Sequence, residues 1–240
     1  AFADTYSKTH NEQGDIHKEV FLNPTIFSLM GEFKNKQVLD AGCGEGYLSR
    51  LLSKGGSNVT AVDYSLRMIE IAQERTPNDL QIKYIKGNCE DLNTLKDTNF
   101  DLIVSNMVMQ DLPNYEKAFQ EMFRLLVEGG SFIFSILHPC FVTPGSGWEK
   151  NDSGEKLHWN VDRYFYEGAH EQRLGDKDKV MFFHRTLTSY VDKLIKTGFT
   201  IESIVEPKPS EKMLEKYPSF EEDLRCADFM VFKATKPKKK

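Results

Sequence analysis

The segment Val38-Leu39-Asp40-Ala41-Gly42-Cys43-Gly44-Glu45-Gly46 decides the fold of this chain. A short apolar run ends in an acid, three glycines follow at alternate positions, and helical periodicity begins at Tyr47. Glycines between a strand and a helix allow a tight turn and let a ligand approach the main chain. The N–H groups that open the helix then face that ligand. The segment therefore predicts a nucleotide-type site at the carboxyl end of a first strand.

Two features of this turn argue against a dinucleotide. The third glycine of G-x-G-x-x-G would fall at Tyr47, and Asp40 would repel a pyrophosphate but could attract an ammonium group. A second strand, expected at 58–63, ends in Asp63, about where an acid accepts hydrogen bonds from a ribose diol. A ligand with a ribose, an α-ammonium group and no phosphate is S-adenosylmethionine.

Four motifs then follow one another along the chain. They are Val38–Tyr47, Val62-Asp63-Tyr64-Ser65, Gly87-Asn88-Cys89-Glu90-Asp91-Leu92 and Phe100-Asp101-Leu102-Ile103-Val104-Ser105. In order and spacing the chain resembles class I S-adenosylmethionine-dependent methyltransferases, in the branch related to ubiquinone and menaquinone methyltransferases. The resemblance covers residues 36–137, with weaker similarity at both ends. It implies an α/β fold with a doubly wound, mostly parallel seven-stranded sheet (Rossmann-like) and a lid-like insertion after the fifth strand.

The resemblance also implies how the cofactor would be held. Gly42 and Gly44 would contact its methionine part, and Asp63 would accept hydrogen bonds from the ribose hydroxyls. Tyr64 and Met68 would pack on the adenine, Asn88 and Cys89 would bind its edge, and Ser105 to Met107 would line the pocket near the sulfonium. The full expected set is Tyr6, Asp40, Gly42, Cys43, Gly44, Asp63, Tyr64, Met68, Asn88, Cys89, Glu90, Ser105, Asn106 and Met107.

Three of these residues have a second interpretation. Asp40 could be an ordinary turn acid, and Asp63 could cap the following helix. Met68 could belong to the helix core instead of contacting adenine. For Cys43 and Cys89 we expect backbone contacts only, without thiol chemistry.

The sequence identifies no residue as clearly catalytic, because the cofactor carries the reactive methyl group and the protein mainly aligns donor and acceptor. His138, just past the fifth strand, is the candidate catalytic base, and a purely structural role is the alternative. Base-directed methyltransferases carry Asn/Asp-Pro-Pro-Tyr/Phe after the fourth strand, where this chain has Ser105-Asn106-Met107-Val108. We therefore expect a small-molecule acceptor, with its identity and its acceptor atom (O, N, C or S) left open.

Composition supports a soluble protein that does not bind nucleic acid. The net charge is −5 and the sequence pI about 5.8, which disfavours a polyanionic partner. The run Lys236 to Lys240 is interpreted as a solvated tail. The four cysteines have neither disulfide nor metal-site spacing, so we expect reduced thiols and no metal. Without a membrane span or a signal-peptide pattern, a cytoplasmic location is expected.

One domain over residues 1–240 is expected, in four parts. Residues 1–36 form an N-terminal helical cover of two short helices broken near Pro24, and 37–137 form the cofactor-binding core. Strands are expected near 37–41, 58–63, 82–86, 100–105 and 130–137, with helices starting near Tyr47, Ser65, Glu90 and Asn114. Residues 188–235 supply a helix and two strands, the last strand of the sheet antiparallel.

The fourth part is the substrate-side insertion, 138–187. Eight of the 45 residues from 141 to 185 are aromatic, including Trp148, Trp159 and Tyr164-Phe165-Tyr166, which disfavours disorder. A substrate-covering lid is preferred to a structural flap that makes no ligand contact. Two other functions stay open: a non-catalytic S-adenosylmethionine-binding protein and a nicotinamide-dependent oxidoreductase. The oligomeric state is not predicted.

Overall fold

The structure is a computed structural model, and it describes residues 2–95, 99–174 and 178–238. Its centre is a seven-stranded sheet in the order β10-β11-β5-β4-β1-β2-β3. The strands are β1 (Gln37–Ala41), β2 (Asn58–Asp63), β3 (Ile82–Lys86), β4 (Phe100–Asn106), β5 (Leu126–Leu137), β10 (Thr200–Val205) and β11 (Phe229–Thr235). β11 pairs antiparallel with both β10 and β5, and the other pairings in this sheet are parallel. The predicted doubly wound, mostly parallel sheet is therefore confirmed.

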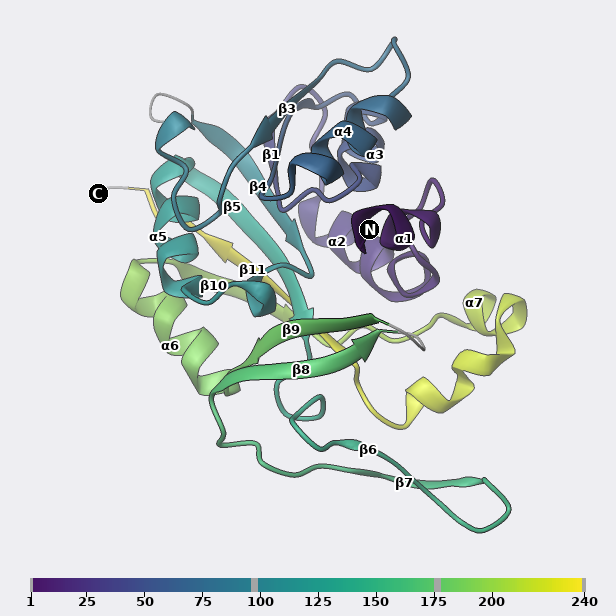
Figure 1. Ribbon diagram of the computed structural model, residues 1–240. Coiled ribbons are helices and arrows are strands. Elements are labelled where there is room, and N and C mark those ends of the chain that lie inside the picture. Colours follow the sequence, from purple (N-terminus) through teal and green to yellow (C-terminus); the bar gives the residue numbers. More distant parts are fainter. Residues whose placement is uncertain (1, 96–98, 175–177, 239–240) are drawn as a thin grey trace.

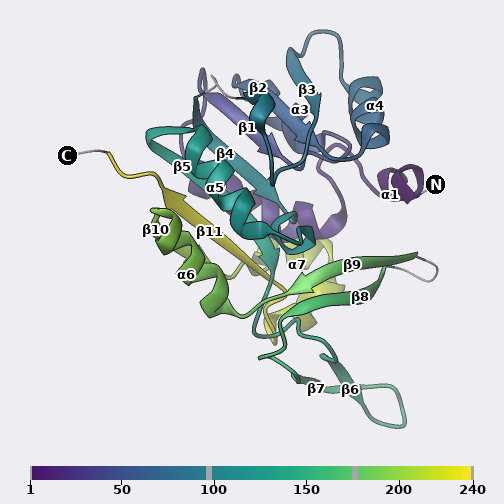
Figure 2. The same ribbon diagram turned by 60° about the vertical axis from the view of Figure 1, so that its left-hand side comes forward.

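Helices cover both faces of this sheet (Figures 1 and 2). One face packs against α5 (Tyr115–Leu125) and α6 (Leu187–Thr197) through the largest apolar cluster, which includes Phe119, Phe132 and Phe134. The other face packs against α2 (Asn23–Met30), α3 (Tyr47–Lys54) and α4 (Leu66–Arg75). Burial on both faces explains why the central strands read as nearly continuous apolar runs.

The switch in strand order lies between β1 and β4. From β1 the chain crosses to β2 and β3 on one side, and later to β4 and β5 on the other. Ligands of open α/β sheets bind outside the carboxyl ends of the strands at such a point. The fold thus directs attention to the residues that end β1, β2 and β4.

The N-terminal cover differs from the prediction. It holds an unpredicted helix α1 (Phe2–Lys8), and a π-helical turn η1 (Lys18–Leu22) runs directly into α2. Pro24 lies in the first turn of α2 and does not break a helix there. The chain stays helical from η1 into α2, with the Asn23 N–H bonded to the Lys18 carbonyl across the junction.

The helix expected to start near Glu90 is absent from the described residues of that segment. Asn88 and Asp91 form a single bridge, and only a 3₁₀ turn, η2 (Asn93–Leu95), follows. The Asn88 side chain accepts a hydrogen bond from the Glu90 N–H, while the Leu92 N–H donates to Glu121 on α5. These side-chain acceptors replace the carbonyls that a helix would use.

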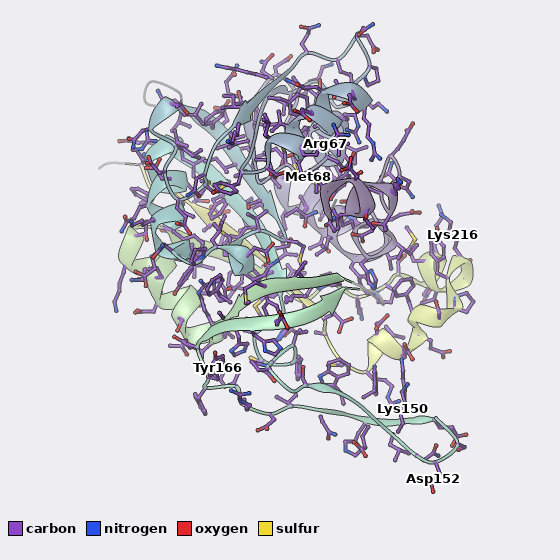
Figure 3. The ribbon with its side chains drawn as sticks, in the orientation of Figure 1. Arg67, Met68, Lys150, Asp152, Tyr166 and Lys216 are labelled. Atoms are coloured by element: carbon purple, nitrogen blue, oxygen red, sulfur yellow. The ribbon has the colours of Figure 1, made fainter. Side chains whose placement is uncertain are left out.

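The insertion after β5 consists of two antiparallel hairpins. They are β6 (Gly147–Lys150) with β7 (Lys156–Asn160), and β8 (Gly168–Leu174) with β9 (Asp178–His184). In Figure 1 the first hairpin extends beyond the sheet. The helix α7 (Glu211–Lys216) and the 3₁₀ segment η4 (Pro218–Leu224) were not predicted, and Glu222 of η4 pairs with Lys156 of this hairpin. Figure 3 shows Lys150 and Asp152 at its far end.

Two details near the start of β5 also differ from the prediction. Strand β5 begins at Leu126, four residues before the predicted 130, and an irregularity separates its first pairing from the rest. Lys236 is no solvated tail residue, because its ammonium group donates to the carbonyls of Phe123 and Leu126 at the end of α5. Lys239 and Lys240 lie outside the described residues. No helix in the described ranges is long and apolar enough to cross a membrane.

Candidate functional site

The glycine turn between β1 and α3 supplies the floor of the site. Gly42, Gly44 and Gly46 all have positive φ (84°, 53° and 82°), a backbone conformation that other residues rarely adopt. A Cβ on Gly42 would come within 2.3 Å of Val108, so this turn packs closely beneath β4. A Cβ on Gly44 would meet nothing within 4 Å. The main chain at Gly44 is therefore open to a ligand, as the prediction requires.

Asp63, at the end of β2, is oriented by two backbone donors. Its Oδ2 accepts from the Gly44 N–H and its Oδ1 from the Ser65 N–H, both at 2.8 Å. Burial raises the pKa of Asp63 despite these two bonds, which favour the carboxylate. The helix cap is a different residue, since the Ser65 hydroxyl accepts from the Met68 N–H at the start of α4. Each carboxylate oxygen keeps a lone pair for a diol.

Asp40, at the end of β1, is buried beneath the glycine turn. Its Oδ2 accepts a hydrogen bond of 2.6 Å from the Ser49 hydroxyl on α3. Burial raises the pKa of Asp40 to about 7, with a smaller contribution from the nearby charge of Asp63 and an opposing one from the Ser49 bond. Ser49 was missed in the sequence, where it reads as an ordinary polar residue of an amphipathic helix.

The residues expected around adenine lie in different environments. Tyr64, in the loop after β2, is 75% exposed, whereas Met68 is buried on α4, where Figure 3 shows it. Cys89 is buried too, and burial raises the pKa values of its thiol and that of Cys43, which keeps both neutral. Glu90 faces elsewhere, because its carboxylate accepts from the backbone and side chain of Asn114.

The end of β4 is built into a buried polar network. The Ser105 hydroxyl donates to the carbonyl of Ala41 on β1, and Asn106 donates to the Tyr47 hydroxyl at 2.6 Å. Ser135 on β5 donates to Asn106 and accepts from the Met107 N–H. Met107 has a φ of 62°, which is unusual for a residue with a side chain of this size. The hydrogen bond from its N–H to the Ser135 hydroxyl holds the backbone in this conformation.

Tyr47 is the centre of that network, whereas the sequence indicated it only as the start of a helix and as the residue that replaces a fingerprint glycine. Its hydroxyl accepts from Asn106 and donates to Asn23 of the N-terminal cover at 3.1 Å. The first residue of α3 thus joins the glycine turn, the end of β4 and the cover. A helix-opening tyrosine in a glycine turn is the only sequence signal that could have indicated this.

Tyr6 lies in the cover beside a buried lysine that sequence reasoning also missed. The Lys18 ammonium donates to the Tyr6 hydroxyl (3.1 Å) and pairs with Asp15 (3.0 Å). It also lies 2.6 Å from His10 Nε2, which must accept because an ammonium only donates. Burial and the adjacent Lys18 charge lower the pKa of His10. The Lys18 ammonium lies 5.4 Å from the centre of the Tyr47 ring.

His138 is placed at the carboxyl edge of the sheet, as predicted, and is 2% exposed. Its Nδ1 accepts from the Cys140 N–H at 3.2 Å, so Nε2 carries the hydrogen and donates to Glu206 at 2.8 Å. Both ring nitrogens are therefore engaged. To act as a base, His138 would first have to release one of these two bonds.

The structure brings together the residues that end β1, β2 and β4 around one open turn. This arrangement offers an oriented carboxylate, a buried carboxyl and an exposed main chain to a neutral or cationic ligand. Glu90 points into the α5 contact instead. Within the described residues there is no cluster of three or more His, Cys, Asp or Glu side chains able to hold a metal ion.

Comparisons with known proteins give relatives in sequence and in fold. Residues 39–134 match the family model described as "Methyltransferase domain". One similar crystal structure is that of a proposed S-adenosylmethionine-dependent methyltransferase from Listeria monocytogenes. Its sequence is 30% identical, the TM-score is 0.79, and the match covers 90% of this chain and 96% of that one. An S-adenosylmethionine-dependent methyltransferase from Mesorhizobium loti is 27% identical, with a TM-score of 0.76 over 88% of this chain and 96% of that one.

A curated relative is similar over a shorter stretch. The ubiquinone biosynthesis O-methyltransferase of Coxiella burnetii is 31% identical over 146 residues, which make up 58% of this chain and 61% of that protein. The matched stretch thus spans less than two thirds of that relative.

Proposed function

Because the chain belongs to the class I S-adenosylmethionine-dependent methyltransferases, we propose that it transfers the methyl group of this cofactor to a small-molecule acceptor by in-line displacement. The observation that supports this most directly is the open main chain at Gly44, bonded to an oriented Asp63. Bound there, S-adenosylmethionine would supply an activated methyl carbon.

The residues present fit the cofactor. Asp63 would accept the ribose hydroxyls on its remaining lone pairs, and Gly42 to Gly44 would receive the methionine part. Asp40, once ionised, would attract the α-ammonium group from below the turn. Ser105 to Met107, held by the Tyr47 and Ser135 bonds, would line the pocket near the transferred methyl. Tyr64 is exposed enough to rearrange over the adenine.

Little proton transfer is required of the protein unless the acceptor must lose a proton. His138 is the proposed group for that step, after release from Cys140. His138→Ala should then reduce turnover, retain S-adenosylhomocysteine affinity and flatten the pH profile. Full turnover at every pH would leave alignment of donor and acceptor as the whole mechanism.

A first experiment is calorimetry with S-adenosylhomocysteine and NAD. We expect saturable binding of S-adenosylhomocysteine alone, whereas binding of NAD alone would favour the oxidoreductase. Transfer of radiolabelled methyl from S-adenosylmethionine to a panel of acceptors then distinguishes an enzyme from a non-catalytic binder. Hydroxyl-bearing compounds come first, because the Coxiella relative is named an O-methyltransferase.

A further inference from the structure

We propose that a cavity under the β6–β7 hairpin binds a flat aromatic ring that carries a negative charge. The cavity has a volume of about 220 Å³ and lies between this hairpin and residues 225–226 that follow η4. None of the residues proposed to hold the cofactor lines it. The site therefore goes beyond the proposed function and can be tested without the cofactor.

Aromatic side chains form the walls of the cavity. Trp148 and Trp159 are paired across the hairpin with their rings at 86° and their centres 5.4 Å apart. The indole N–H of Trp159 donates to the carbonyl of Phe141 at 2.9 Å, which fixes that ring. Phe141 and Val161 complete the apolar lining. Preorganised aromatic faces favour a flat ring, and an apolar cavity of about 150 Å³ already admits benzene.

Arg225 gives the cavity a positive side. Its guanidinium lies 4.7 Å from the centre of the Trp148 ring and donates to the backbone carbonyls of Lys156 and Leu157. These acceptors are neutral, and in the described part of the chain no carboxylate forms an ion pair with Arg225. By contrast, Lys156, which also lies over Trp148, is paired with Glu222. An anionic group on the ligand would supply the partner that Arg225 lacks.

Cys226, the residue after Arg225, also lines the cavity and disfavours a negative charge beside it. Cys226 lies near Asp228 and Asp223, whose charges add to burial in raising the pKa of its thiol. An anionic group placed there would be repelled. The negative charge should therefore face Arg225, while the ring packs against the tryptophan side chains that line the cavity.

Intrinsic fluorescence tests this directly, because Trp148 and Trp159 are the only tryptophans in the chain. Benzoate is the probe, with benzyl alcohol as its neutral match and benzylamine as its cationic match. We expect a saturable change in emission with benzoate and binding at least tenfold weaker for the two matches. No saturable change with benzoate, or equal binding of all three compounds, would overturn the proposal.

Variants then locate the site. Arg225→Gln should weaken benzoate binding about tenfold or more, because a charge-assisted bond is lost. Arg67→Gln, on α4 far from the hairpin (Figure 3), should leave it unchanged. Val161→Phe at a half-exposed position should fill the cavity and abolish binding. If both cavity variants bind benzoate like the wild type, the site is wrong. Failure of S-adenosylhomocysteine binding would instead contradict the proposed function.

Discussion

Asp40 must be ionised to hold an ammonium group, yet its burial raises its pKa to about 7. Binding of an amino-acid-bearing ligand should therefore strengthen as the pH rises through neutrality. With a pKa near 7, about one Asp40 in eleven is ionised at pH 6 and about ten in eleven at pH 8. The affinity for S-adenosylhomocysteine should rise roughly tenfold across this range, or about 1.4 kcal/mol.

Calorimetry at pH 6, 7 and 8 measures this change, and buffers of different ionisation enthalpy reveal the proton that binding releases. Adenosine is the internal control, because it shares the ribose and adenine but lacks the ammonium group. The affinity for adenosine should depend on Asp63 and not on the ionisation of Asp40. Asp40→Asn keeps the shape of the side chain and its contact with Ser49, and should remove the difference in pH dependence between the two ligands.

Two results would refute this reasoning. The first is an S-adenosylhomocysteine affinity in the wild type that stays constant from pH 6 to 8. The second is an Asp40→Asn variant that retains the full pH dependence. Either would make Asp40 a structural acid bonded to Ser49, and the ammonium group would have another partner.

Four further predictions concern the turn and the insertion. Asp63→Ala should weaken S-adenosylhomocysteine by about 1.5–3 kcal/mol, roughly ten- to hundredfold by calorimetry, and unchanged affinity would remove Asp63 from the site. Gly44→Val should abolish binding, with a cost in folding stability of only about 1–2 kcal/mol from the positive φ of this residue. Gly42→Ala should unfold more readily, because its Cβ meets Val108. Normal binding by a folded Gly44→Val variant would contradict the assignment of the turn. The folded-state pKa of Asp40 lies above its unfolded value of 3.8, so stability should fall as pH rises from about 4 to 7, and Asp40→Asn should lessen that fall in thermal melts from pH 4 to 8. If the hairpins form a lid, S-adenosylhomocysteine should slow tryptic cleavage at Lys150, Lys156 and Arg163. A cleavage pattern that does not depend on the ligand, together with full activity after Tyr164→Ala and Tyr166→Ala, would make the insertion a structural flap.

Much of the fold could be predicted because its signals are local. The apolar runs at 37–41 and 58–63, the Ser65 cap and the stripe on α5 each lie within a short window of sequence. The alternate glycines after Asp40 specify a turn through the φ angles that only glycine adopts easily. Such patterns depend on neighbours along the chain, and the structure confirms them.

The failed predictions have a common cause. The local sequence predicted a helix at Glu90. In the structure, the side chains of Asn88 and Glu121 accept hydrogen bonds from the N–H groups of Glu90 and Leu92 instead. Pro24 reads as a breaker, yet the chain stays helical across it, directly after the π-helical turn η1. In both cases, contacts or positions that a sequence window does not contain decided the outcome.

The sequence by itself determined where the strands lie along the chain, the glycine turn and the acids that end β1 and β2. Only the tertiary structure decided which side chains meet at that edge. Tyr47 bonds Asn106, 59 residues away, and His138 bonds Glu206, 68 residues away. Backbone conformation follows from local sterics and periodicity, whereas these pairings depend on how separate strands and helices pack, which no local pattern encodes.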